Sequence, residues 1–169
     1  MLFHGNTIKL DFQFDWRHEK RRSDYRTISL AELYDCGKGD LRFAVAGCDF
    51  GTRWGWVSAI QCALHLMELT DDLACSKGVQ VFEFMEITDV IRFERLLRSV
   101  RVTASYAPGE AIVPLWDLVI AIRKFSKRVV RVASRDRNGL LENPYISKLM
   151  SAPTAPARWS DVIPGELVN

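Results

Sequence analysis

The sequence feature that most limits the possible folds is an amphipathic helix predicted at 114–135. Pro114 suits the first turn of a helix, and apolar residues then recur at helical spacing over about five turns. The members of this stripe are Leu115, Leu118, Val119, Ile122, Phe125, Val129 and Ala133. A helix with so long an apolar face is stable only when that face packs on another element. The rest of the chain must therefore supply a matching apolar layer.

Period-2 patterns predict that this layer is a β-sheet. Apolar and polar residues alternate from Ile8 to Phe14, and Trp16 continues the apolar face. Further strands are predicted at 25–33, 41–45, 79–87, 90–96 and 99–106, with the charged stretch 17–22 as a hairpin connection. Segment 79–87 is apolar on both faces, which is typical of a central strand. We expect a mostly antiparallel sheet of about six strands.

A second main helix is predicted at 54–70, where the spacing of apolar residues changes from two to between three and four. Its apolar sector is so wide that we expect it to be almost wholly covered. Asn143 can cap a short helix that begins at Pro144. These elements predict an α+β fold with one domain at 1–150 and a proline-rich tail at 151–169, in which Trp159 can pack on the domain.

Composition limits the kinds of partner and compartment. The chain has 169 residues and a net charge of +2, from 23 basic and 21 acidic residues, which is too small for a general field that attracts nucleic acid. No basic leader with an apolar run and no membrane-length apolar stretch is present, so we expect a cytoplasmic protein. The four cysteines, Cys36, Cys48, Cys62 and Cys75, are then expected to be reduced and mostly buried.

Motifs for catalysis, metals or cofactors are absent from the sequence. His4, His18 and His65 fall in separate elements without metal-ligand spacing, and the glycine-bearing stretches 37–40 and 51–55 match no phosphate-binding loop. We therefore expect no metal, no cofactor and no catalytic residues. An enzyme with a non-contiguous site remains an alternative, and its candidate residues are His65, Glu68 and Cys48.

The candidate partner-binding residues lie mainly on the polar side of the predicted helix 114–135. They are Arg123, Lys124, Lys127, Arg128, Arg131 and Arg135, opposite the apolar stripe. Favourable interaction with the helix dipole, solvation and ion pairing account for such a face without a function. The alternative is a surface that binds an acidic protein or nucleic acid. Trp54, which Gly55 separates from Trp56, is a further candidate as an exposed interface anchor.

The run GDLRFAVAGCDF at 39–50, followed by an apolar helix with tryptophan at its start, further strands and a terminal helix, resembles small bacterial single-domain proteins. These include immunity proteins of toxin systems and related uncharacterised families, and the likeness covers 8–150. It implies a non-catalytic protein that neutralises a toxin by direct binding. Immunity proteins against nucleic-acid-cleaving toxins are often acidic, so for this mildly basic chain the resemblance implies a toxin with an acidic or neutral contact surface.

Overall fold

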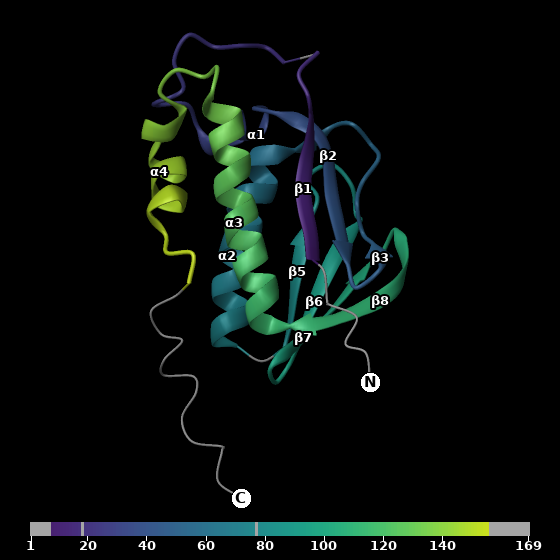
Figure 1. The fold of residues 1–169 in the computed structure, drawn as a ribbon. Helices are drawn as coiled ribbons and strands as arrows, with labels where there is room; N and C mark the ends of the chain where they lie inside the picture. Colours follow the sequence, from purple (N-terminus) through teal and green to yellow (C-terminus); the bar gives the residue numbers. More distant parts are fainter. Residues whose placement is uncertain (1–7, 18, 77, 156–169) are drawn as a thin grey trace, which may run out of the picture.

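Residues 8–155, except 18 and 77, are described by a computed structural model. Within them four α-helices and two antiparallel sheets form an α+β fold (Figure 1). The first sheet contains β1 (Ile8–Asp15), β2 (Lys38–Val45), β3 (Cys48–Asp49) and β4 (Val57–Ser58). The second contains β5 (Val79–Glu83), β6 (Val90–Leu96), β7 (Ser99–Ala104) and β8 (Ala107–Pro114). The helices are α1 (Leu30–Tyr34), α2 (Ala59–Cys75), α3 (Leu115–Ser134) and α4 (Pro144–Ser151). The α+β class and the antiparallel pairing are confirmed, although the strands form two sheets rather than one.

In the first sheet, β1 and β2 pair along their whole length. Leu10 lies opposite Phe43 and Phe12 opposite Leu41, so the inward side chains of both strands form one apolar face. Gly39 permits this pairing, because a Cβ at that position would lie 1.9 Å from the carbonyl oxygen of Gln13. The strands are therefore held closer at this point than any other residue would allow.

The second sheet is a meander in the order β5-β6-β7-β8. Among the described residues β5 pairs with β6 alone, so the prediction of a central strand at 79–87 is wrong. Val79 and Val81 stay 50% and 40% exposed, because they lie on the face of the sheet opposite the buried Phe82 and the helices. At the other margin, β8 lies against β3 of the first sheet, where the Cys48 thiol donates a hydrogen bond to the carbonyl oxygen of Glu110 at 3.3 Å.

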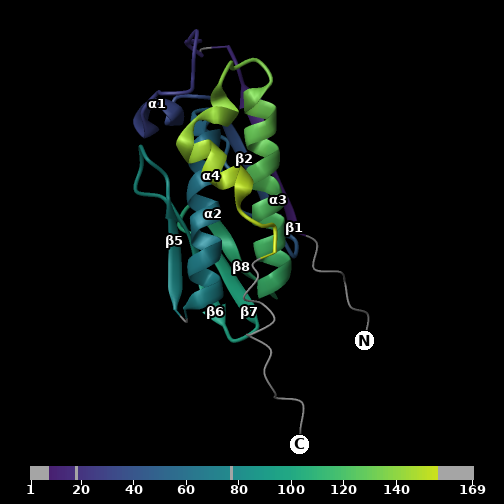
Figure 2. The same cartoon turned by 90° about the vertical axis from the view of Figure 1, so that its left-hand side faces the viewer.

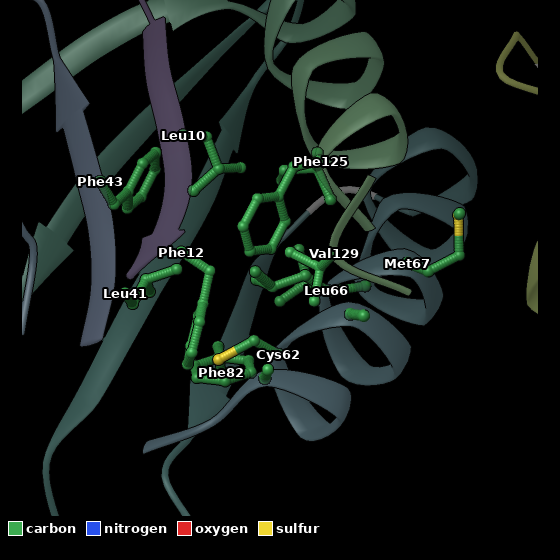
Figure 3. Packing of buried hydrophobic residues seen from close by; sticks show 14 of the residues in the cluster. Leu10, Phe12, Leu41, Phe43, Cys62, Leu66, Met67, Phe82, Phe125 and Val129 are labelled. Carbon is green, nitrogen blue, oxygen red and sulfur yellow. The ribbon is translucent and has the colours of Figure 1, made fainter. Parts of the chain in front are cut away.

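Helices α2 and α3 pack on each other and on both sheets, whereas α4 lies on their opposite side (Figures 1 and 2). Figure 3 shows Leu10 of β1 facing Phe125 and Val129 of α3 and Leu66 of α2, while Phe12 points toward Phe82 of β5. Leu66, Phe82, Phe125 and Val129 are at most 2% exposed. One apolar cluster thus joins both sheets to the helix pair.

The predicted strand at 25–33 is wrong. Tyr25 and Leu33 are buried in a loop and in the short helix α1, and β1 pairs directly with β2. α1 begins with a capping box, in which the Ser29 hydroxyl accepts from the N–H of Glu32 and the Glu32 carboxylate accepts from the N–H of Ser29. Two backbone donors at the start of the helix are satisfied in this way. Segment 17–22 is consequently not a hairpin connection.

The predicted helices occur with shifted ends. α2 begins at Ala59, because Ser58 caps it by accepting from the N–H of Gln61, and it continues to Cys75, beyond the predicted end at residue 70. α3 lies within one residue of its predicted bounds at each end. The expected cap of α4 is confirmed, since the Asn143 side chain accepts from the N–H of Tyr145. Trp159 and residues 156–169 of the predicted tail lie outside the described residues.

Candidate functional site

The residues of the predicted basic face of α3 differ in their surroundings: some are bound inside the protein and others are exposed. Arg123 is only 2% exposed, contrary to the expectation of a solvent-facing residue. Its Nε donates to the Thr70 hydroxyl at 3.0 Å, and its terminal nitrogens bind the Asp71 carboxylate and the carbonyl oxygen of Pro153. The side chain therefore joins α3 to α2 and to the segment that follows α4. It is not available to an external partner.

Two more of the predicted binding residues have internal partners. Lys127 is half-buried and donates to the carbonyl oxygen of Ala152. Arg128 donates to the carbonyl oxygen of Leu10 and lies 3.3 Å from the Asp11 carboxylate. Arg128 thereby occupies the outer edge of β1, although half of its side chain stays exposed.

The exposed cations of this face, including the exposed half of Arg128, form an exposed basic stripe, which consists of Lys124, Arg128, Arg131 and Arg135. Positions separated by three, four and seven residues lie on one side of an α-helix, so these side chains follow one ridge of α3. Within the part of the chain that the structure describes, Lys124, Arg131 and Arg135 make no side-chain hydrogen bond or ion pair. The stripe is thus a smaller basic surface than the sequence predicts.

Trp54 is half-buried rather than a bare anchor. Its ring stacks on Trp56 with centroids 5.3 Å apart, and it meets the rings of Phe84 and Tyr106 edge-on at 5.0 Å each. Tyr106 is fixed in turn by donating to the carbonyl oxygen of Phe50 at 2.7 Å. This aromatic cluster joins the loop before α2 to the second sheet, and that structural role accounts for Trp54.

The alternative enzyme site is brought together only in part. His65 and Glu68 line a hollow of about 300 Å³ beside α4, and the ring Nε2 of His65 is hydrogen-bonded to the Tyr34 hydroxyl at 2.7 Å. Cys48 lies elsewhere, at the contact between β3 and β8. Burial raises the pKa of Tyr34 and lowers the pKa of His65, so at neutral pH both are uncharged. This arrangement provides no ionised nucleophile.

Burial of His65 makes stability depend on pH. The pKa of His65 in the folded chain lies below its unfolded value of about 6.5, because desolvation outweighs the attraction of Glu68. Between the two values the unfolded chain binds more protons, so the free energy of unfolding should fall as pH falls below about 6.5. Urea titrations at about pH 7.5 and pH 5 should show a larger loss for the natural chain than for His65→Gln. Equal losses would contradict the prediction.

The cysteines offer little reactivity where they are buried. Burial raises the pKa of Cys36 to about 11 and raises that of Cys62 further, so neither is a thiolate at neutral pH. Cys36 and Cys62 are buried as expected, whereas Cys48 is half-buried and Cys75 is exposed. Among the residues described, no group of three His, Cys, Asp or Glu side chains is placed to hold a metal ion. None of the described helices has the length and apolar character needed to cross a bilayer.

A hollow of about 470 Å³ lies between segment 15–22 and α1. Charged side chains of both signs line it. Arg22 lies 2.8 Å from Glu32, and Glu19 is bound by Arg137. Because the lining mixes both signs of charge, the hollow has no clear preference for a ligand of one charge.

Another surface, which the sequence did not predict, is a groove of about 430 Å³ between α2 and β5. We call it the β5 groove. Its acidic residues are Glu68 and Asp72 of α2 and Glu83 of β5, and no Lys or Arg is found among the described residues that line it. The other polar residues of the lining are Gln61, His65 and Gln80. Val81 and Met85 add apolar surface, and Met85 is 55% exposed. The groove is thus acidic and partly apolar.

The β5 groove and the basic stripe give the molecule two oppositely charged sides. In Figure 2, β5 and α3 lie on opposite sides of α2. The net charge of +2 does not reveal this separation, because positive and negative charges on different surfaces offset each other in the total. The sequence alone did not predict the β5 groove. The exposed valines of β5, Val79 and Val81, belong to a period-2 pattern that by itself assigns them to a buried position.

Comparisons with protein-family models, with curated proteins and with solved structures found no match to this chain.

Proposed function

We propose that this chain is a protein-binding domain without a catalytic centre of its own. The observation that carries the proposal is the uncovered margin of the second sheet at β5, where exposed valines lie beside the β5 groove. Exposed apolar strand margins promote pairing with other polypeptides, and folded proteins usually cover or charge them. A surface of this kind is suited to a protein partner.

The other classes receive less support from the same residues. Phosphate groups would be repelled by Glu68, Asp72 and Glu83, so the β5 groove does not suit nucleic acid. The candidate enzyme residues His65 and Cys48 have different hydrogen-bond partners in different parts of the molecule. A binding function needs no catalytic residue or cofactor besides the residues described, so we propose binding rather than catalysis.

In its most specific form, the proposal is that the chain acts as a bacterial immunity protein in the cytoplasm and neutralises a toxin by occupying its surface. The support is the resemblance in the order of elements, together with an exposed binding margin. The test is co-expression with the protein encoded by the neighbouring gene. A stable complex on gel filtration and rescue of growth are expected. Absence of both the complex and the rescue would overturn the proposal.

The basic stripe favours one second candidate, binding of nucleic acid through α3. Replacing Lys124, Arg131 and Arg135 together by Gln removes exposed cations that have no internal partners among the described residues, so the free energy of unfolding should change by less than about 1 kcal/mol. If the stripe binds nucleic acid, the natural chain should shift a DNA or RNA probe at about 50 mM salt and the variant should not. No shift by the natural chain at that salt would exclude this candidate.

A further inference from the structure

The hydrogen-bond pattern of β5 fixes which of its backbone groups face outward. Arg95 N–H donates to the Gly78 carbonyl at 2.9 Å, and Phe84 N–H donates to the Asp89 carbonyl at 3.4 Å. In an antiparallel ladder, residues alternate between bonding to the partner strand and pointing away from it. The even-numbered residues from Gly78 to Phe84 therefore bond to β6. Val79, Val81 and Glu83 direct their N–H and C=O groups to the open side.

Most of these outward groups have no partner in the described part of the chain. The exception is the carbonyl oxygen of Glu83, which accepts from the Gln61 side chain at 3.0 Å. The N–H and C=O groups of Val79 and Val81 and the N–H of Glu83 remain unpaired among the described residues. They form a row that another strand can continue, and we call this row the open edge of β5.

Two other outer strands each have a side chain bound at the edge. Arg128 of α3 donates to the Leu10 carbonyl at β1, and Cys48 of β3 donates to the Glu110 carbonyl at β8. At β5, Gln61 binds only the Glu83 carbonyl, at one end of the strand. Val79 and Val81 have no such contact among the described residues, and Figure 2 shows no strand on the outer side of β5.

We infer that the open edge of β5 binds an extended, basic segment of a partner protein, which adds a strand to the second sheet. Residues of the added strand opposite Val79 and Val81 would share their face of the sheet and should be apolar. The residues between them would point to the other face, toward Glu68 and Asp72 in the β5 groove, and should be Lys or Arg. The recognised pattern is thus an alternation of apolar and basic residues.

Charge favours this occupant over a second copy of the chain. Two copies joined edge to edge would bring Glu83 and the neighbouring Glu68 and Asp72 close to the same acids of the other copy. Like charges at such a junction oppose pairing, whereas a basic segment neutralises them. A dimer that forms through β5 in solution, detected by light scattering, would overturn the inference.

This inference rests on the proposed function and is tested with a defined probe. The probe is the peptide Lys-Val-Lys-Val-Lys-Val-Lys, titrated into the ¹⁵N-labelled full chain at low salt. We expect the amide signals of Val79, Val81 and Glu83 to shift, and their hydrogen exchange to slow. The matched peptide with Glu in place of Lys should bind at least about tenfold more weakly. No binding of the Lys peptide at about 1 mM, or equal binding of both, would overturn the inference.

Two variants at Val81 separate backbone pairing from side-chain contact. Val81→Pro removes an outward N–H that β6 does not use, so the strand should still form, because proline is accepted on edge strands in this position. Val81→Thr keeps the N–H and the branched shape. The proline variant should bind the probe at least about tenfold more weakly than the threonine variant. Equal affinities would contradict strand addition.

A modified probe makes the test independent of the folding of Val81→Pro. N-methylation of the three valines of the peptide blocks the donors that would face β5 and should abolish the shifts. Undiminished binding would overturn the inference. If a natural partner forms a complex that Val81→Pro leaves unchanged, strand addition is wrong and the proposed function stands. If the probe binds at β5 but the neighbouring gene product forms no complex and gives no rescue, the proposed function fails and the peptide site stands.

Discussion

Replacing Glu19 by Ala is expected to lower the free energy of unfolding by about 3–5 kcal/mol. The side chains of Glu19 and Arg137 are only 6% and 3% exposed, and Arg137 binds both oxygens of the carboxylate, with its Nε at 2.9 Å. Glu19 also accepts from the N–H of Gly37 at 3.2 Å. Its removal would leave a buried guanidinium without its counter-charge, which costs more than the pair contributes. Urea denaturation measures the loss.

The neighbouring pair Arg21 and Asp136 is the matched control. It joins the same two segments but is 3.9 Å apart and largely exposed, so Asp136→Ala should cost less than about 0.5 kcal/mol. Adding Arg137→Met to Glu19→Ala should cost less than the sum of the single changes, because the second change removes the unpaired charge. Additive losses, or a loss at Glu19 no larger than at Asp136, would show that the buried pair is not what fixes this segment.

Glu19 illustrates why part of the structure was beyond prediction from the sequence. In the stretch 17–22 it stands among basic residues and reads as one charge of an exposed connection. Its partner is far away along the chain, just after α3, and the guanidinium of that partner also lies 4.6 Å from the ring centre of Trp16. Such pairs depend on the three-dimensional path of the chain, which local patterns do not contain.

Sequence patterns predicted the elements correctly where the buried residues recur with the regular spacing of a single helix or strand. β1, β6 and α3 each have one apolar face on the core, so their alternation predicts both type and approximate bounds. Segment 79–87 is instead apolar on both faces, and only the face of Phe82 packs on the core, because the helices cover one face of the second sheet. The sequence therefore predicted the strand and missed its open edge, which is the feature that carries the proposed function.

The failure at 25–33 has another cause. Thr27 and Ile28 favour a strand, and the helix that follows has only 5 residues, too few to show helical periodicity. The decisive signal was the spacing of Ser29 and Glu32, which form a capping box. This signal is present in the sequence and could have been used.

Arg123 shows the same limit for the candidate binding site. It lies four residues after Val119 and seven before Val130, which are both buried, so helical spacing places it nearer the apolar side than Lys124 or Arg131. All three were nevertheless predicted to meet a partner. Its burial depends on α2 and on the segment at Pro153, which reach α3 only in the folded chain. We therefore expect Arg123 to stabilise the fold, and the exposed Lys124, Arg131 and Arg135 to have no such role.

Arg123→Met should lower the free energy of unfolding by about 2–3 kcal/mol. Methionine fills much of the same space but leaves Asp71 and the Pro153 carbonyl without their shared donor. Arg123→Lys should recover little of the loss, because one ammonium group lacks the planar set of donors that reaches Thr70, Asp71 and Pro153 together. Urea denaturation gives the loss in stability, and hydrogen exchange at Ala152 should become faster as the segment after α4 is released.

Lys124→Met provides the control at the adjacent position of α3. Lys124 is exposed and makes no side-chain hydrogen bond or ion pair within the described residues, so its replacement should change stability by less than about 0.5 kcal/mol. If Arg123→Met were as stable as the natural chain and weakened a protein complex instead, Arg123 would be a binding residue, as was predicted from the sequence. A loss of stability with binding unchanged would instead assign Arg123 to the fold. Faster hydrogen exchange at Ala152 in the absence of any partner would support this role, because Arg123 binds the neighbouring Pro153 carbonyl.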